Sequence, residues 1–149
     1  MYTSSAIKAY NTVSVESEII GADPHKLISL LYRGALLEIA NAKNGISRKE
    51  IQSKGASITK TIAIIGEGLN ASLDKKVGGE LAQNLSSLYD YMISRLIAAN
   101  LNNDIAALDE VALLLTDLKG AWDTIRPNQM QPEAPRVQNN NAQKVYGRA

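Results

Sequence analysis

The chain has 149 residues, a formal net charge of +1, and 45% apolar but only 5% aromatic residues. This length is enough for one domain with a single core. The absence of cysteine excludes disulfides, thiol catalysis and cysteine-based metal sites. A single histidine, His25, excludes metal sites built from several histidines. The near-neutral charge argues against nucleic-acid binding, which depends on neutralising many phosphates.

The chain has no apolar run near the roughly 20 residues that span a bilayer. Its first residues also lack the charged start and the apolar stretch of a secretory signal. We therefore expect a cytosolic protein without membrane insertion.

Proline placement predicts the fold class and the division of the chain. The prolines are Pro24, Pro127, Pro132 and Pro135, so a long proline-free interior rich in Leu, Ile and Ala remains. This composition, without alternating strand patterns, predicts an all-α fold. We expect an N-terminal arm or lid over residues 1–22, with a short helix at most, and a bundle over residues 23–125. Residues 126–149 hold three of the prolines and eight Asn or Gln, which predicts a flexible tail.

The first long helix is predicted to begin at Asp23 and Pro24, which suit the N-cap and the first helical position. Leu30 and Leu37 widen its apolar face, so the helix should pack against several neighbours. Gly45 is expected to end it in a left-handed cap. Its central apolar row is Leu27, Leu31, Ala35 and Ile39.

The second helix is predicted to open with a capping box, because Ser47 and Glu50 have the S-x-x-E spacing. Its apolar residues then recur at gaps of three and four as far as Leu69. Gly66 and Gly68 should permit a close approach by another backbone or loosen that turn. A turn is expected over residues 74–79.

Two further helices complete the prediction. The third runs from about Glu80 to Asn100, and the fourth follows a turn at residues 102–104. Short connections between helices of this length predict an antiparallel, up-down four-helix bundle. The core row of the third helix is Leu81, Leu85, Leu88, Met92 and Leu96. That of the fourth is Leu108, Val111, Leu115, Leu118, Trp122 and Ile125, with Trp122 as a plug at one end of the core.

Residues for catalysis are scarce, and we predict no catalytic, cofactor or metal site. His25 has no nucleophile or acid motif around it and is interpreted as a helix-end residue. The carboxylates of the fourth helix, Asp109, Glu110, Asp117 and Asp123, read as a solvated face, with an acidic binding stripe as the alternative.

Four aromatic or apolar residues have two readings. Tyr89 and Tyr91 flank the core row, either packing at the bundle edge with bonded hydroxyls or contacting a partner. Ile7 and Tyr10 lie one helical turn apart in an arm too short to bury them alone. They form either an ordinary lid or a displaceable lid over a groove that receives a partner's apolar helix.

Several blocks of the sequence resemble the FliS family of flagellin export chaperones. They are Met1-Tyr2 with Tyr10, residues 23–28 and 30–35, Ile64-Ile65 with Leu69 and Leu73-Asp74, Gly78-Gly79-Glu80-Leu81-Ala82, residues 84–92, Leu96 with Ala99-Asn100, Glu110-Val111 and Ala121-Trp122. The strongest block is Asn84-Leu85-Ser86-Ser87-Leu88-Tyr89-Asp90-Tyr91-Met92. Together they cover residues 1–125 in order, and the tail lies outside the resemblance.

The resemblance implies a cytosolic helical bundle that binds the disordered C-terminal segment of flagellin. It also implies that the chaperone prevents premature polymerisation and delivers flagellin to the flagellar export gate. The arm is similar to a pseudo-client that covers part of the flagellin site, with Ile7 and Tyr10 as its anchors. The predicted partner-binding residues are Ile7, Tyr10, Leu30, Leu37, Tyr89 and Tyr91.

The sequence leaves alternatives open. A small helical adaptor or regulator that binds a folded partner would have a similar composition. A homodimer without client is also possible, through the second apolar side of the first helix. An enzyme is disfavoured because no nucleophile–base pair, metal cluster or cofactor loop is present in the sequence.

Overall fold

The computed structural model describes residues 23–125, so the predicted arm and tail lie outside the described residues. The described chain is helical throughout and has no strand: α3 (Pro24–Ser47), α4 (Ile51–Ala63), the π-helix η1 (Ile64–Asn70), α5 (Lys75–Asn102) and α6 (Ile105–Thr124). Chain contacts divide the protein into two units, Met1–Lys119 and Gly120–Ala149. The boundary falls within α6, so all four helices contribute to the first unit.

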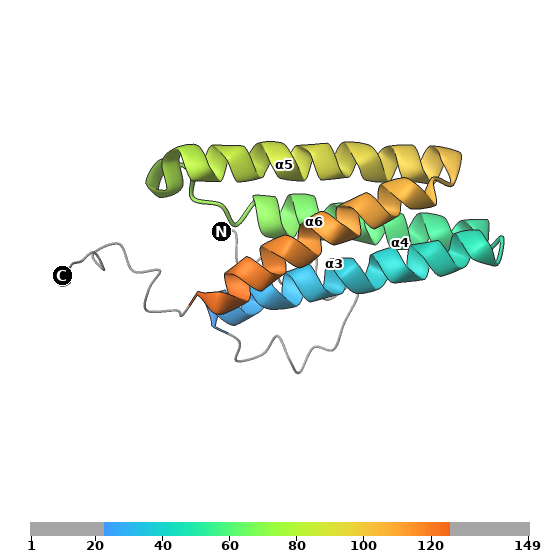
Figure 1. The fold of residues 1–149 in the computed structure, drawn as a ribbon, viewed down its shortest axis with the longest axis horizontal. Helices are drawn as coiled ribbons and strands as arrows, with labels where there is room; N and C mark the ends of the chain where they lie inside the picture. The colour runs from blue at the N-terminus through green and yellow to red at the C-terminus, as the bar shows by residue number, and fades with distance from the viewer. Residues whose placement is uncertain (1–22, 126–149) are drawn as a thin grey trace. The chain divides into compact units, whose positions relative to one another are not determined.

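Within the first unit the helices alternate in direction. Figure 1 shows α3 and α5 running one way and α4 and α6 running the other way. The predicted all-α, antiparallel up-down bundle is therefore confirmed. Its core is aliphatic, and all four helices contribute to it. Its large, fully buried aliphatic side chains include Leu31, Ile39, Ile58, Ile64, Ile65, Met92, Leu96, Leu108 and Leu115.

Helix α3 begins where the sequence predicts but ends later. The Asp23 carboxylate accepts a hydrogen bond from the Lys26 backbone N–H at 2.7 Å and caps the helix. Gly45 does not end the helix, because it lies inside α3 and faces α4. A Cβ atom on Gly45 would lie 3.0 Å from the backbone of Lys54, so only glycine permits this approach. The left-handed residue of the turn is Lys49, with φ of 60°.

The second predicted helix is present, but it begins later than predicted and its last turns form a π-helix. Ser47 belongs to α3, and Glu50 caps α4 without a side-chain hydrogen bond, so the predicted capping box is wrong. The last seven residues widen into η1, which holds both Gly66 and Gly68. A Cβ on Gly68 would lie 3.2 Å from the Leu31 side chain, so this glycine permits close contact with α3.

Helix α5 starts earlier than predicted. Asp74 caps it by accepting hydrogen bonds from the backbone N–H groups of Lys76 and Val77, and Gly79 then interrupts it with φ of 55° and ψ of −131°. Its buried face also differs from the predicted row, because Leu81 is 69% exposed. Small residues and Tyr89 take the place of leucines and let α5 lie close to its neighbours. The buried residues are Ala82, Ser86, Tyr89, Met92, Leu96 and Ala99.

Helix α6 buries the first part of its predicted row. Asp104 caps it by accepting a hydrogen bond from the Ala107 backbone N–H at 3.2 Å. Its buried residues are Ala107, Leu108, Val111 and Leu115. Trp122 is half-buried, so it is not the predicted core plug.

Candidate functional site

The residues predicted to bind a partner have different environments. Ile7 and Tyr10 lie outside the described residues. Leu30 and Tyr89 are buried, with 3% and 2% of their surface exposed. Leu37 and Tyr91 are exposed at 50% and 45%, on α3 and α5. The described members of the set therefore divide into two that are buried in the protein and two that face solvent.

Tyr89 has the bonded hydroxyl of its first predicted environment, but it lies in the interior of the bundle and not at its edge. Its hydroxyl lies 2.7 Å from the hydroxyl of Tyr32, which joins α5 to α3 inside the protein. Burial raises the pKa of the Tyr89 hydroxyl far above its usual value, and the neighbouring Tyr32 adds to the rise. Burial also raises the pKa of Tyr32, although the hydrogen bond with Tyr89 opposes this effect. Both hydroxyls are therefore neutral, and the pair links two helices.

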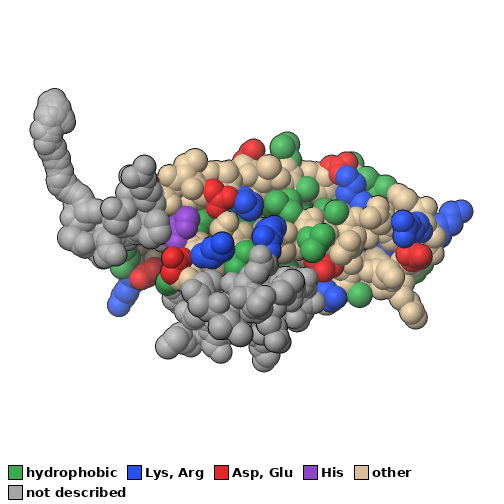
Figure 2. Space-filling model, turned by 90° about the horizontal axis from the view of Figure 1, so that it is seen from below, with side chains coloured by type: hydrophobic (Ala, Val, Ile, Leu, Met, Phe, Trp, Pro, Cys, Tyr) green, Lys and Arg blue, Asp and Glu red, His purple; other side chains and the backbone are tan. Residues whose placement is uncertain are grey.

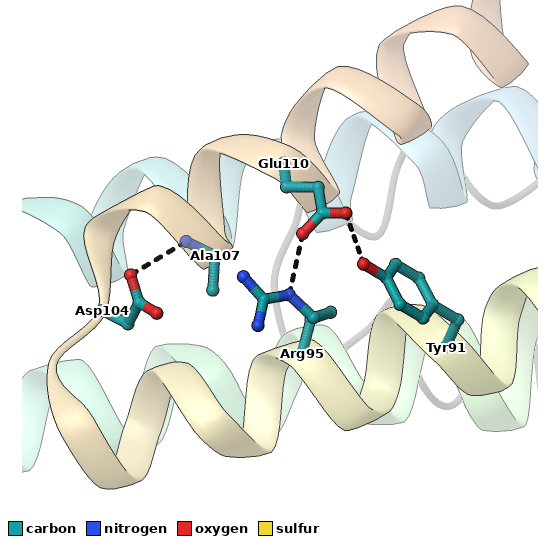
Figure 3. A network of polar contacts seen from close by, with 5 residues as sticks. All are labelled: Tyr91, Arg95, Asp104, Ala107 and Glu110. Atoms are coloured by element: carbon teal, nitrogen blue, oxygen red, sulfur yellow. Dashed lines mark hydrogen bonds and ion pairs between the residues drawn. The ribbon is translucent and has the colours of Figure 1, made fainter.

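Tyr91 belongs to a different face of α5, which is turned toward α6. Tyr91 and Arg95 both contact Glu110 of α6, as Figure 3 shows. Leu88 lies three residues before Tyr91, and Leu81 lies two turns before Leu88, so the two leucines form a row beside Tyr91. Leu88 is half-buried, and Leu81 is exposed. Apolar side chains therefore recur along this side of α5 toward its start, with the exposed Asn84 between them.

Helix α6 has a matching apolar row. Leu114 and Leu118 follow Glu110 at intervals of four residues, so they share the side of α6 that faces α5. Both are half-buried. Figure 1 shows α6 close to α5 at their shared turn and separating from it farther along. We define the α5–α6 apolar strip as Leu81, Leu88, Tyr91, Leu114 and Leu118.

A polar network closes the strip at the end where the two helices are close (Figure 3). The Tyr91 hydroxyl donates to one oxygen of Glu110 at 2.5 Å, and Arg95 Nε donates to the other at 2.7 Å. The hydrogen bond from Tyr91, and then that from Arg95, lowers the pKa of the Glu110 carboxyl. The same bond raises the pKa of Tyr91. Glu110 is thus ionised and uses both oxygens to hold α6 against α5. We call these three residues the α5–α6 clamp.

Lys54 ties the same end of the bundle to α4. It is buried, and its ammonium donates to the Asn100 carbonyl oxygen at 2.8 Å and to Asn103 Oδ1 at 2.7 Å. A cation at the end of α5 is favourable because the last carbonyl groups of a helix carry partial negative charge. Asn103 has the left-handed conformation that turns the chain into α6. Lys54 therefore fixes the turn from which α6 departs.

The remaining features give no chemical centre. A hollow of about 230 Å³ between α3 and α6, lined by Leu36, Ile39, Ala40, Lys43, Asn44 and Ala112, is smaller than typical small-molecule sites of about 300–1,000 Å³. Within residues 23–125, His, Cys, Asp and Glu nowhere form a group of three that could hold a metal. None of the helices in that range is long and apolar enough to cross a membrane. Figure 2 shows acidic and basic side chains interspersed with apolar ones.

Sequence reasoning missed most of this site. The predicted core rows include Leu81, Leu88 and Leu118, and the predicted solvated face of the fourth helix, or its alternative as an acidic binding stripe, includes Glu110. The four-residue interval between Tyr91 and Arg95 is visible in the sequence and places them on one face. The sequence does not predict that Glu110 is their partner, because that contact depends on how α6 packs against α5. Lys54 gives no local signal either, since its partners lie at the far end of α5.

Comparison with known proteins gives an extensive match. The chain matches the family model described as "Flagellar protein FliS" over residues 6–129, which contain all four helices. It is 49% identical to the flagellar secretion chaperone FliS of Salmonella typhimurium, over 85% of this chain and 94% of that protein. Flagellar secretion chaperone FliSB of Pseudomonas aeruginosa is also 49% identical, over 84% of this chain and 98% of that protein. FliS of Bacillus subtilis is 34% identical, over 78% and 86%.

Proposed function

The chain belongs to the FliS family, and on that basis we propose that it is a flagellar export chaperone whose client is flagellin. It binds the disordered C-terminal segment of flagellin in the cytosol, prevents premature polymerisation and delivers the client to the export gate. FliS is a chaperone family by the names of these relatives and not a family of enzymes.

The α5–α6 apolar strip is the structural observation that supports this proposal. It offers apolar side chains from two helices, at a place where α6 separates from α5. An amphipathic client helix satisfies its own backbone hydrogen bonds and can bury its apolar face against such a strip. Ordering a disordered client opposes binding by about 2–5 kcal/mol. The complex can then be specific and still release its client at an export gate.

The test is a calorimetric titration with a peptide of about the last 40 residues of flagellin, long enough to bury a large apolar area. We expect one-to-one binding with a large negative heat-capacity change, because apolar surface is buried as the peptide folds. Absence of binding would contradict the proposal and favour the adaptor that binds a folded partner. Light scattering on the same samples measures whether the protein is a homodimer without client.

Two exposed apolar residues on α5 give a matched pair of variants for that titration. Leu81, on the strip, is 69% exposed, and Ile97, sixteen residues later and on nearly the opposite side of the helix, is 55% exposed. Leu81→Ser should weaken peptide binding roughly tenfold, since a buried leucine contributes about 1.5–3 kcal/mol. Ile97→Ser should leave the affinity unchanged. If the two substitutions changed the peptide affinity equally, the strip would not be part of the binding site.

The proposal includes the arm as a competitor of the client. Ile7 and Tyr10 are its proposed anchors, and the exposed Leu37 on α3 is proposed as a further client contact, whereas Leu30 is buried and supports α3 from the interior. If the arm covers the client site in the empty chaperone, Ile7→Ala with Tyr10→Ala should strengthen peptide binding. Unchanged affinity in this double variant would contradict competition while leaving client binding intact.

A further inference from the structure

Two adjacent carboxylates tie α6 to two different helices. Glu110 bonds to Tyr91 and Arg95 of α5, at 2.5 and 2.7 Å. Asp109 forms an ion pair with Lys43 of α3, with 2.6 Å between Lys43 Nζ and Asp109 Oδ1. Residues next to each other on a helix point to different sides, so these contacts hold two different sides of α6. Glu110 therefore sets the separation of α6 from α5, and Asp109 sets its separation from α3.

The contacts of Glu110 with α5 lie at one end of the α5–α6 apolar strip. Leu88 lies one turn before Tyr91 on α5, and Leu114 lies one turn after Glu110 on α6. Figure 3 shows the Tyr91 hydroxyl pointing at Glu110. The width of the strip therefore depends on the geometry of the clamp, although Glu110 and Arg95 add no apolar surface to it.

We propose that Arg95 and Glu110 are positioning residues, which fix the place where α6 leaves α5 and so hold the strip in the form that binds the client. The proposal rests on the proposed function for its effect on client binding. The clamp side chains are partly exposed, and ion pairs in such places add little to stability. Both oxygens of Glu110 accept hydrogen bonds, from Tyr91 and Arg95, which lie one helical turn apart on α5. Two such contacts restrict the position of α6 relative to α5 more than a single contact does.

The first experiment measures the position of α6 without any client. Because the chain has no cysteine, Ser87→Cys with Asp117→Cys places two spin labels on exposed sites of α5 and α6 beyond the clamp. Glu110→Ala should broaden or shift the distance between the labels measured by pulsed electron resonance. Asp109→Ala, the matched control, releases α6 from α3 and should leave this distance as it is. An unchanged distance in Glu110→Ala would overturn the proposal whether or not flagellin binds.

The second experiment measures peptide affinity in a double-mutant cycle. Tyr91→Phe removes the hydroxyl and keeps the ring that lines the strip. We expect Glu110→Ala to weaken binding about fivefold, and Tyr91→Phe to weaken it only while Glu110 is present. Asp109→Ala should bind like the wild type. Positioning would be contradicted if the wild type bound the peptide and Glu110→Ala bound it equally well. It would also be contradicted if Tyr91→Phe lowered the affinity equally with and without Glu110. Either result would leave the proposed function standing.

Discussion

Tyr89 and Tyr91 are two residues apart on α5 and have opposite environments. Two residues correspond to a rotation of about 200° around a helix, so the two side chains leave on opposite sides. One hydroxyl is bonded to Tyr32 in the interior, and the other is bonded to Glu110 at the surface. The first therefore contributes to stability, and the second contributes to the geometry of a surface.

The buried tyrosine pair allows a stability prediction. Tyr89→Phe leaves the Tyr32 hydroxyl buried without its partner, which should destabilise the protein by about 1–3 kcal/mol. The double variant Tyr32→Phe with Tyr89→Phe removes both polar groups and should recover most of this loss. Denaturant unfolding of the two single variants and the double variant measures it. Additive losses would show that the two hydroxyls do not depend on each other.

The Glu110 carboxyl predicts a pH dependence of stability. Its pKa is lowered in the folded protein by Tyr91 and Arg95. A lowered pKa means that the contribution is present above the ordinary value of about 4.5 and is lost as the pH falls through the folded value. The stability difference between wild type and Glu110→Gln should therefore be constant at neutral pH and shrink in acid. Unfolding curves collected from about pH 7 to pH 3 measure it, and parallel pH profiles would contradict it.

At the scale of elements, the ends of the helices are set by contacts between helices as much as by capping signals. α3 passes through its expected end because Gly45 lies against the backbone of Lys54. Lys54 in turn reaches the end of α5 and the turn before α6. One pair of contacts at the start of α4 therefore aligns α3, α4 and α5 and fixes where α6 begins.

Gly45 and Gly120 make this role of glycine testable. A Cβ at Gly45 meets rigid backbone at 3.0 Å, so Gly45→Ala should destabilise the protein by about 1–3 kcal/mol. A Cβ at Gly120 meets nothing within 4 Å, and Gly120→Ala should stabilise α6 by up to about 1 kcal/mol. Thermal unfolding of both variants gives the two signs. A stabilising Gly45→Ala would mean that α3 and α4 are not held at this separation.

At the scale of the whole molecule, the family match contains the whole described fold and extends beyond it at both ends. The match ends at residue 129 and contains every described helix. The composition of the tail beyond it offers almost no large apolar side chain to a core or to a client. Stability and client binding should therefore reside in the matched part.

Truncation tests that assignment. Removal of residues 130–149 should leave the melting temperature unchanged and the affinity for the flagellin peptide within about twofold. Removal of residues 1–22 is the contrasting truncation, and it should strengthen peptide binding if the arm competes with the client. A loss of affinity in the first truncation would place a client contact in the tail.

The sequence by itself determined the all-α class, the number of helices, the start of α3 at Asp23 and the family. These follow from local signals, because the spacing of apolar residues, a capping carboxylate and the position of proline act within a few turns of one helix. Only the tertiary structure decided which side of α5 is buried, so that Ala82 faces inward while Leu81 faces outward. It alone also paired Lys54 with Asn103, and Glu110 with Tyr91 and Arg95. The reason is that such partners lie on different helices, and the way those helices pack selects them.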